Sequence, residues 1–543
     1  MSSRTSCFLL IIILIIAALF RFGGLMWGEG YHFHPDENNL AQAVLNLSQK
    51  NDPQFYSYGQ LPIFLSLFSA QLYNLFSFIH QQKNIDFNEI IFFLRFWSAI
   101  AGVASVFWVY YLGKIIINRR GGVIAALVTA FLPGLIQSAH FGTTESLLAF
   151  FYLTIIYCSI KLYQKRKLVN FVWVGLSLGL ALATKASAVL FILTPLMAIL
   201  LLKTKNYPTK KLFLGLLTMF LIALAVTIFF SPFLVIDHLN SLNALGYEVA
   251  IAQGKKTIFY TRQFLNTKPF LFQIKKIFPF SIGWPVLLLA PLGIIPIITN
   301  KKDQKRSFLW LIILVPALIF FLYQGQLFVK WTRFMTPLLP IFSLLFAQIA
   351  VSMPKIIQFI VLVVSILPGL IFFDLVYSNP DTRYQFSNWA KENLPESSLI
   401  LSESGNVINL PLEKINNLKV INFDFYQLEE RSSQDQLSQI LEKADYLLVP
   451  SRRIFANHHQ DQFPNTASYY QKLFSGQLGF IHLKTFSPTN RWFPLNYYYQ
   501  QAEINAEETW TVFDHPTVRI YQKKHPYSKM DYQQMLFTSF HEQ

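Results

Sequence analysis

Cysteine and charge are both scarce in this chain. Cys7 and Cys158 are its only two cysteines, and both lie in or at the edge of apolar segments, which is typical of small hydrophobic side chains and argues against a disulfide. Charged residues make up 14% of the 543 residues and hydrophobic residues 53%, a composition too apolar for an ordinary soluble enzyme. The sequence also has no phosphate-cradling glycine loop, no zinc motif and no nucleophile elbow. Their absence argues against nucleotide hydrolysis as a source of energy.

Acidic residues are especially few in the first part of the chain. Residues 1–378 contain 30 Lys and Arg against 11 Asp and Glu, whereas residues 379–543 contain 15 against 18. The net charge of +16 therefore resides in the apolar part, where short loops rich in Lys and Arg orient membrane helices. We expect membrane lipids, and no nucleic acid, as partners.

The sequence is rich in apolar runs near twenty residues, the length that spans a bilayer as a helix. The runs suited to spanning are 8–27, 92–113, 123–141, 145–160, 169–183, 186–202, 212–236, 281–299, 307–327, 334–352 and 356–377. A further run, Leu61–Ile79, is amphipathic and interrupted by Gln71 and Asn74. The first run follows a basic start at Arg4 and lacks a clear cleavage site, so we expect it to remain as a helix. These features predict a polytopic α-helical membrane protein with about 11 transmembrane helices.

The distribution of basic residues predicts the orientation of these helices. If Leu61–Ile79 lies in the interface and the N-terminus is cytoplasmic, the inward loops are 114–122, 161–168, 203–211, 300–306 and 353–355. Those loops hold 16 basic residues and one acid, Asp303, in agreement with the positive-inside rule. If Leu61–Ile79 spanned, all of them would face outward. The first outer loop is then 28–91, with interfacial helices, and a long outer loop covers 237–280. Residues 1–378 form the transmembrane domain of a plasma-membrane protein.

Residues 379–543 are predicted to form an extracytoplasmic α/β domain. Short apolar stretches, typical of strands, alternate there with polar helical stretches such as Ser432–Lys443. The predicted strands are 399–401, 420–423, 446–449, 480–483 and 518–521. The length of the region suits one hydrophobic core. Its position alone suggests that it docks an acceptor, and its role is otherwise open.

The adjacent acids Asp36 and Glu37 point most directly to chemistry. They lie in the first outer loop just beyond the first span, with His34 beside them, and ionisable groups held close to a bilayer usually mark a working site. One carboxylate could act as a general base while its neighbour orients it or binds a cation. Glu145, in a very short outer connection, would be confined to the same surface. Alternatively, the pair belongs to an ordinary solvated loop, and Glu145 caps the following helix.

Basic residues are expected on the same outer surface. Lys185 lies between two spans, and Lys330 and Arg333 lie at the outer start of another. They could hold the phosphate of a lipid-linked substrate, for which arginine offers bidentate geometry. They could equally extend to lipid headgroups, as long basic side chains near helix ends do.

A divalent metal ion is the one cofactor that the sequence leaves open. Carboxylate and imidazole groups near the outer surface could bind such a cation. The candidate ligands are His34, Glu145 and His238. The sequence fixes no spacing between them, so a metal requirement is an alternative and not a prediction.

Six motifs, taken in order, resemble those of the GT-C superfamily of membrane glycosyltransferases. They are His34–Glu37, Tyr58–Pro62, Leu94–Ala99, Leu132–Gly134 leading to Glu145, Leu182–Lys185 and Arg333–Pro340. Each motif is loose alone, but together they cover about residues 5–350 in the family's order. The chain is similar in particular to protein O-mannosyltransferases and aminoarabinose–lipid A transferases, of glycosyltransferase family 39. It departs from some members in having His34-Pro35 before the acidic pair.

The resemblance implies a GT-C-like fold and transfer of a sugar from a polyprenyl-phosphate-linked donor to a hydroxyl acceptor on the extracytoplasmic face. By analogy, Asp36 would be the general base, and the reaction would invert the anomeric carbon. The carboxylates that would shape the site or share a cation are Glu37 and Glu145. The cations that would neutralise the departing lipid phosphate are Arg333, Lys185 and Lys330. Fixed cations of this kind stabilise charge that develops in a transition state.

Other functions remain alternatives at this point. An oligosaccharide ligase acting from a lipid pyrophosphate would have a similar topology. A transporter of lipid or sugar usually places ionisable groups near the bilayer midplane and shows inverted repeats, whereas here the acids gather at the outer edge and no repeat is visible. The sequence leaves open which sugar moves and whether the acceptor is a protein, a lipid or a cell-envelope glycan.

Overall fold

The computed structural model describes residues 1–76, 85–204, 208–299, 303–403, 410, 412, 418–489 and 496–537. Within this part the chain forms two compact units. The first comprises Met1–Leu25, Asp36–Lys255 and Lys268–Phe373, and the second comprises Met26–Pro35, Lys256–Thr267 and Asp374–Gln543. The end of the predicted interfacial segment, 77–79, and three lysines of the predicted inward loops, Lys205, Lys301 and Lys302, lie outside the described residues.

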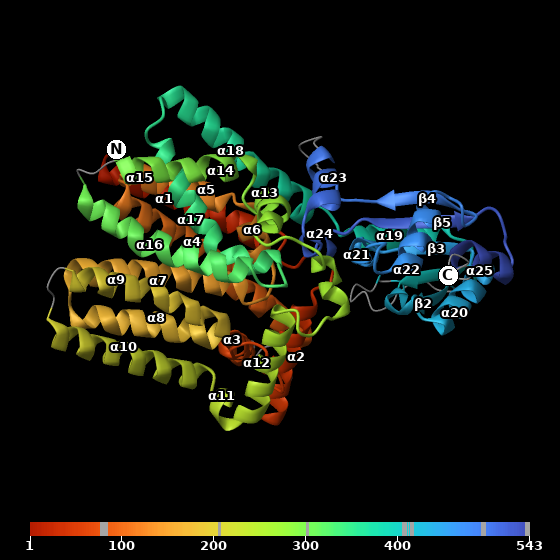
Figure 1. The fold of residues 1–543 in the computed structure, drawn as a ribbon, viewed down its shortest axis with the longest axis horizontal. Coiled ribbons are helices and arrows are strands. Elements are labelled where there is room, and N and C mark those ends of the chain that lie inside the picture. The colour runs from red at the N-terminus through yellow and green to blue at the C-terminus, as the bar shows by residue number, and fades with distance from the viewer. Residues whose placement is uncertain are drawn as a thin grey trace. The chain divides into compact units, whose positions relative to one another are not determined.

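The first unit is built from helices (Figure 1). Its first half contains α1 (Ser3–Phe22), α2 (Pro35–Lys50), α3 (Leu61–Phe76), α4 (Phe87–Ile116), α5 (Arg119–Ala130), α6 (Pro133–His140), α7 (Glu145–Lys165), α8 (Leu168–Thr184), η2 (Ala186–Ile192) and α9 (Leu193–Lys203). Its second half contains α10 (Thr209–Phe230), α11 (Phe233–Ile236), α12 (His238–Ala252), η4 (Gln273–Ile277), α13 (Phe278–Ser281), α14 (Trp284–Leu289), η5 (Ala290–Gly293), α15 (Ile294–Thr299), α16 (Gln304–Gly325), η6 (Thr332–Leu338), α17 (Leu339–Ala350) and α18 (Lys355–Tyr377).

The predicted polytopic α-helical architecture is confirmed. By length and composition, eight helices among the described residues could cross a membrane, or up to ten if each of two bent pairs is one span. The predicted segment 169–183 corresponds to α8, an apolar helix of 17 residues. The chain is therefore that of an integral membrane protein.

The two bent pairs explain where long apolar runs stop being straight helices. α5 and α6 meet at 56°, and the helices on either side of Gly283 meet at 120°. The first break precedes Pro133, whose ring cannot continue the preceding turn. At the second break Gly283 has a φ of +78°, a conformation that side chains larger than glycine's disfavour. A run of apolar residues alone does not reveal either bend.

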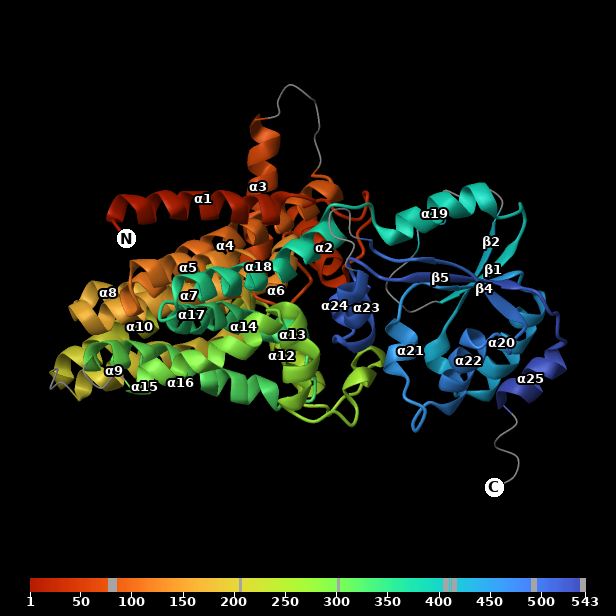
Figure 2. The same ribbon diagram turned by 90° about the horizontal axis from the view of Figure 1, so that it is seen from above.

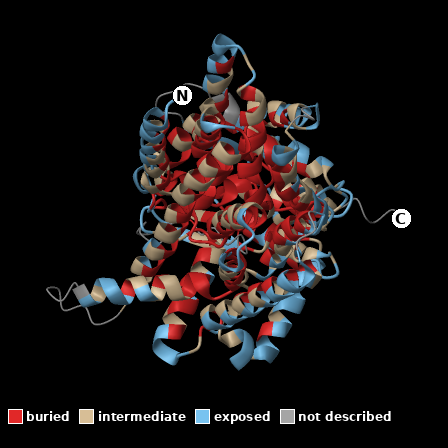
Figure 3. Cartoon of the chain, turned by 90° about the vertical axis from the view of Figure 1, so that its left-hand side faces the viewer, coloured by how far each residue is buried: buried red, intermediate tan, exposed pale blue. Residues whose placement is uncertain are grey.

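The core of the first unit lies around α7. Of its spanning residues 72% are buried, against 22% for α10, which places α7 at the centre and α10 at the periphery. Figure 3 shows the buried residues gathered in the middle of the bundle and the exposed ones on its outer helices. α2, α3 and α12 run across the direction of the bundle helices (Figures 1 and 2). The interfacial position predicted for Leu61–Ile79 stays a prediction.

The second unit contains a five-stranded mixed sheet with strand order β2-β1-β3-β5-β4 (Figure 2). The strands are β1 (Leu399–Glu403), β2 (Lys419–Phe423), β3 (Tyr446–Val449), β4 (Phe480–Phe486) and β5 (Val518–Lys523). β1 pairs in parallel with β2 and β3, whereas β5 runs antiparallel to β3 and β4. The helices are η3 (Phe259–Phe264), α19 (Thr382–Asn393), η7 (Phe425–Gln427), α20 (Arg431–Lys443), α21 (Arg453–Asn457), α22 (Pro464–Phe474), α23 (Asn496–Asn505), α24 (Thr509–Val512) and α25 (Lys529–Phe537). The predicted α/β domain is confirmed.

Both faces of this sheet are covered. Successive side chains of a strand point to opposite faces, and in β3 Leu447 and Val449 pack with residues of α20, α22 and α25. Tyr446 and Leu448 pack on the other face, with Phe386 of α19. All four strand residues are buried, which gives β3 the continuous apolar pattern of a central strand.

Candidate functional site

Asp36 lies in the first turn of α2, where its carboxylate is held by two side chains from other parts of the first unit. Arg333, at the start of η6, forms an ion pair with Asp36 Oδ2. The Tyr58 hydroxyl donates a hydrogen bond to the same oxygen over 3.1 Å. The side chains of Arg333 and Asp36 are 28% and 19% exposed, so the pair is open to a ligand.

A second ion pair lies beside the first. Lys185 Nζ, just beyond the end of α8, is 3.0 Å from Glu145 Oε1 at the start of α7. The same ammonium lies 4.6 Å from the centre of the Tyr58 ring and 5.8 Å from that of Phe334. Tyr58 therefore contacts both ion pairs. We call Asp36, Tyr58, Glu145, Lys185 and Arg333 the charge cluster.

Arg333 is the member of the cluster that could hold an anion. Its guanidinium lies 4.5 Å from the centre of the Trp331 ring, a stacking position that fixes its plane. Its Nε is buried and has no hydrogen-bond partner among the described residues. A guanidinium with a spare donor and a partly exposed edge suits bidentate binding of a phosphate.

Tyr58 reaches the cluster because the next two residues bind neighbouring helices. A Cβ on Gly59 would lie 2.1 Å from the carbonyl oxygen of Ala183, so only glycine permits this approach to the end of α8. The Gln60 side chain accepts a hydrogen bond from the Phe233 backbone N–H over 3.2 Å. Burial raises the pKa of Tyr58 well above its usual value, and the Asp36 carboxylate adds to this. The phenol therefore stays protonated and remains a donor.

Glu37 takes different contacts from its neighbour. Its two oxygens lie 2.7 Å and 3.0 Å from Arg95 of α4, and one accepts the Gly142 backbone N–H over 2.5 Å. Arg95 also donates to the Leu25 carbonyl oxygen over 3.0 Å. Neither side chain of the ion pair is exposed. Glu37 therefore ties the first turn of α2 to α4 and to the α6–α7 connection.

The three candidate metal ligands lie in three different settings. Glu145 is paired with Lys185, and His238 is exposed at the start of α12. His34 is 3% exposed, and its ring centre lies 4.5 Å from that of Phe513 in the second unit. Among the residues that the structure describes, no three His, Cys, Asp or Glu side chains are close enough to hold a metal ion. A metal requirement stays an alternative.

The residues before Asp36 belong to the second unit. The Arg383 guanidinium lies 3.4 Å from the centre of the Phe33 ring. Arg383 is itself fixed by the Asp381 carboxylate and by the Phe513 carbonyl oxygen, at 2.5 Å and 2.7 Å. Phe33 and His34 therefore both contact the C-terminal part of the chain.

Lys330 has contacts other than those of the charge cluster. Its Nζ donates to the Phe328 carbonyl oxygen over 2.9 Å, and the side chain is 3% exposed. Burial lowers the pKa of Lys330 to about 8, because an ammonium loses hydration in an apolar setting. The role of Lys330 as a phosphate ligand stays a prediction.

Lys330→Met is expected to raise the free energy of unfolding at pH 7 by about 1–3 kcal/mol, because the buried charge is removed. The pKa is about 8 in the folded protein and about 10.4 in an unfolded chain. Between these values the unfolded state binds more protons, so wild-type stability rises with pH there. Thermal unfolding in detergent from pH 7 to pH 10 measures this rise, which the variant should lack. Lys255→Met, at an exposed lysine, is the control. If Lys330→Met left stability unchanged but weakened donor binding, Lys330 would be a ligand of the donor phosphate.

Two contributors to the site were not singled out in the sequence. The Tyr56 hydroxyl donates to Asp237 over 2.8 Å and so connects the segment before α3 to the start of α12. Hydrogen bonds from Asn240 and Tyr56 lower the pKa of Asp237. Glu248, on α12, is close enough to act electrostatically on Tyr58 and Arg333. Glu248 is one of the few acids in a long basic loop, which is the signal that could have identified it.

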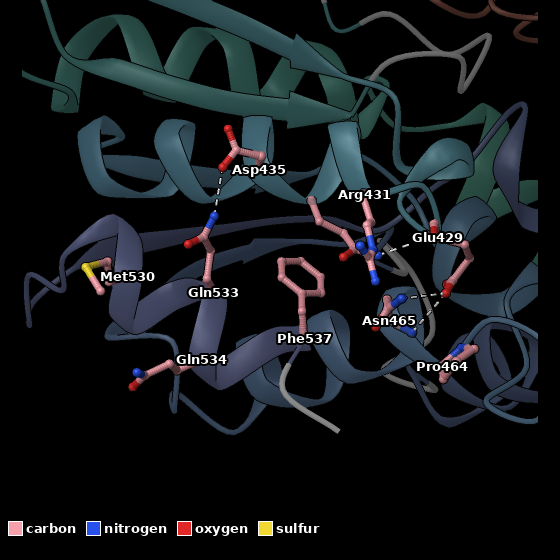
Figure 4. A pocket seen from close by; sticks show the side chains of 10 residues that line it. Glu429, Arg431, Asp435, Pro464, Asn465, Met530, Gln533, Gln534 and Phe537 are labelled. Carbon is pink, nitrogen blue, oxygen red and sulfur yellow. Dashed lines mark hydrogen bonds between the residues drawn. The ribbon is translucent and has the colours of Figure 1, made fainter. Parts of the chain in front are cut away.

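One pocket of the second unit is lined mostly by polar residues, several of which are hydrogen-bonded to one another. It measures about 760 Å³ and lies between α20, α22 and α25 (Figure 4). Glu429 accepts hydrogen bonds from the backbone N–H groups of Asn465 and Thr466, at 3.3 Å and 3.0 Å, and so caps α22. Gln533 donates to Asp435 over 2.8 Å. These contacts stabilise helix ends, and none of the charge cluster lines the pocket.

Part of the chain matches a family of known enzymes. Residues 86–235 match the model of the dolichyl-phosphate-mannose-protein mannosyltransferase family. The matched region contains Arg95, Glu145 and Lys185 but neither Asp36 nor Arg333. No curated protein matches the chain in sequence.

Solved structures with a similar fold cover most of the chain. The oligosaccharyltransferase of Archaeoglobus fulgidus, in the apo form, has a TM-score of 0.55 and 15% identity over 91% of this chain and 76% of that one. The same archaeal enzyme, AglB, in complex with an inhibitory peptide and a dolichol-phosphate has a TM-score of 0.54 and 14% identity, over 89% and 73%. ArnT from Cupriavidus metallidurans, bound to undecaprenyl phosphate, has a TM-score of 0.51 and 11% identity, over 82% and 93%.

These comparisons establish the fold. The relatives are membrane glycosyltransferases of the GT-C type, and the present chain has their architecture. The resemblance predicted from the sequence motifs is therefore confirmed.

Proposed function

We propose that this protein is a glycosyltransferase that moves a sugar from a polyprenyl-phosphate-linked donor to a hydroxyl acceptor outside the cytoplasm. One observation carries the proposal: Asp36, a carboxylate that can accept a proton, is paired with Arg333, a cation that can hold a phosphate. A transferase of this kind needs both groups within one sugar's length of each other. The pair also lies in the part of the chain that has the GT-C fold.

The chemistry follows from the leaving group. Asp36 accepts the proton of the acceptor hydroxyl as its oxygen bonds to the anomeric carbon. The bond from that carbon to the phosphate oxygen breaks, and its electron pair leaves with the lipid phosphate. Because attack and departure take place on opposite sides, the anomeric configuration inverts. A general base of this kind contributes about 10²- to 10⁴-fold to the rate.

The cations of the cluster oppose the charge that develops on the phosphate. The phosphate of the donor carries one negative charge, and the released lipid phosphate carries up to two. Arg333 binds it most directly, and Lys185, oriented by Glu145 at 3.0 Å, adds a second positive charge. Interactions that strengthen as charge develops lower the barrier more than they tighten ground-state binding.

The relatives support the kind of donor. The archaeal enzyme was solved in complex with a dolichol-phosphate and ArnT bound to undecaprenyl phosphate, and both ligands are polyprenyl phosphates. The concentration of Lys and Arg in the predicted inward loops supports an extracytoplasmic site. We propose that the N-terminus is cytoplasmic and that the second unit is extracytoplasmic.

A ligase that moves a whole oligosaccharide is the second candidate. The similarity to oligosaccharyltransferases, which covers 91% of this chain, favours it. The proposed base and cations would serve either donor. The mass of the transferred group separates the two functions.

The test is transfer by the purified full-length protein in lipid. Monosaccharides on polyprenyl phosphate and oligosaccharides on polyprenyl pyrophosphate are supplied with peptide, lipid and glycan acceptors, and products are identified by mass spectrometry. A mass gain of one sugar supports the main proposal, and a gain of a whole oligosaccharide supports the second. Uptake into liposomes without any covalent product would overturn both and indicate a transporter.

Arg333→Gln is expected to raise the KM for the donor by about 10- to 100-fold, because a charge-assisted hydrogen bond contributes about 1.5–3 kcal/mol. Initial rates at varied donor and saturating acceptor measure the effect. Arg333→Lys keeps the charge without the bidentate geometry, so its KM for the donor should lie between those of wild type and Arg333→Gln. An unchanged donor KM together with an unchanged kcat in Arg333→Gln, or a change only in the acceptor KM, would remove Arg333 from phosphate binding.

A further inference from the structure

In the proposed reaction Arg333 binds the donor phosphate, but in the structure it already forms an ion pair with Asp36. We infer that the donor phosphate competes with Asp36 for Arg333, so that donor binding is what turns Asp36 into an effective base. This inference rests on the proposed function and adds an order of events to it. It follows from the Asp36–Arg333 ion pair and from the charges around it.

Before the donor binds, Asp36 is a poor base. Its carboxylate has an ion pair with Arg333 and a hydrogen bond from Tyr58 at 3.1 Å. Both contacts stabilise the ionised form, because a nearby cation and a donated hydrogen bond favour negative charge. A carboxylate held in this way has little tendency to take a proton from an alcohol.

Each cation of the charge cluster is already paired with a carboxylate. The groups near Asp36 and its partner include Arg333 of η6, Tyr58 before α3, Glu145 of α7, Lys185 after α8 and Glu248 of α12. The neighbouring Glu37 is bound to Arg95. Three carboxylates thus already face two cations. A phosphate that binds Arg333 or Lys185 therefore draws on a cation that a carboxylate already contacts.

Donor binding therefore strengthens the base by two routes. The phosphate takes over part of the Arg333 charge, and its own negative charge lies near Asp36. Each effect favours a proton on Asp36, which is the state that the base reaches when it deprotonates the acceptor. At an effective dielectric near 20, two unit charges about 6 Å apart interact strongly enough to change a proton or ligand affinity by roughly 10- to 100-fold.

The same competition resets the site after transfer. The released lipid phosphate keeps Arg333 while the proton remains on Asp36. When the lipid phosphate leaves, Arg333 returns to Asp36, and the restored ion pair releases the proton to water. The donor thus binds first, the acceptor hydroxyl reacts second, and the protein does not activate hydroxyl groups without a donor.

Proton-linked binding tests the inference without requiring turnover. The probe is a methyl phosphodiester of a short isoprenoid alcohol, whose phosphate does not titrate near neutral pH. Its affinity for the full-length protein in detergent is measured from pH 4.5 to pH 8. We expect wild-type affinity to fall by roughly tenfold or more as pH rises, because ionised Asp36 competes for Arg333 and protonated Asp36 does not. Calorimetry in two buffers with different ionisation enthalpies should show proton uptake on binding.

Two variants make the test specific. Asp36→Asn should bind the probe with an affinity that varies little with pH, and Tyr58→Phe should show a smaller pH dependence than wild type. Glu29→Gln, at an exposed carboxylate of the same outer loop, should keep the wild-type dependence. A pH dependence that survives in Asp36→Asn, or tight and pH-independent binding to wild type, would overturn the inference while leaving the proposed function intact. No binding at any pH, together with no transfer, would overturn both.

Discussion

Asp36→Asn is expected to lower the rate of transfer by about 10²- to 10⁴-fold, the contribution of a general base. The amide that replaces the carboxylate cannot accept the hydroxyl proton. The variant should still fold, because the ion pair that it loses is partly exposed, with side chains 28% and 19% accessible, and such pairs contribute about 0–1 kcal/mol. The measurement is kcat at saturating donor and acceptor, with thermal unfolding as the check on folding.

Glu29→Gln is the matched control for this variant. Glu29 lies seven residues before Asp36 in the sequence and is exposed, so its loss should leave kcat within about twofold. Full activity of Asp36→Asn would exclude Asp36 as the base. Loss of activity in both variants would indicate a general requirement for acidic charge in this loop.

Glu37→Gln is expected to lower the free energy of unfolding by about 3–5 kcal/mol, because it leaves Arg95 charged and unpaired in the interior. Both side chains are fully buried and 2.7 Å apart. The double variant Glu37→Gln with Arg95→Gln removes both charges and should recover part of the loss. Thermal unfolding of wild type, of Glu37→Gln, of Arg95→Gln and of the double variant in detergent forms the cycle.

The exposed pair Asp303–Arg306 is the control for this cycle. Its side chains are 40% and 53% exposed, so Asp303→Asn should change stability by at most about 1 kcal/mol. If Glu37→Gln kept full stability but lost transfer, Glu37 would belong to the chemistry, as the sequence motif suggests. If it lost stability in proportion to activity, the buried ion pair serves to position α2.

The sequence predicted the parts of the fold that depend on local patterns. Apolar runs near twenty residues identified the membrane helices, and short apolar stretches identified the five strands, because burial imposes those lengths. The tight contact of Gly59 depends on Ala183, which lies far away in the sequence. A run of apolar residues does not predict which other helices its own helix will contact.

The partners of the candidate site residues could likewise not be predicted from the sequence. Asp36 and Glu37 are adjacent, and on a helix adjacent side chains point about 100° apart, so they meet different partners. Asp36 meets Arg333, 297 residues later, and Glu37 meets Arg95, 58 residues later. Charge type and order along the chain predicted that both acids were important. Only the packing of α2 against other helices decides which carboxylate faces a ligand and which is buried.

The assignment of residues 26–35 to the second unit limits how the protein can be shortened. A fragment ending near residue 373 would retain Asp36, Glu145, Lys185 and Arg333 in its sequence. It would lack Arg383 and Phe513, whose contacts with Phe33 and His34 hold the chain immediately before Asp36. A shortened version that keeps Phe33 and His34 in place therefore has to retain Arg383 and Phe513.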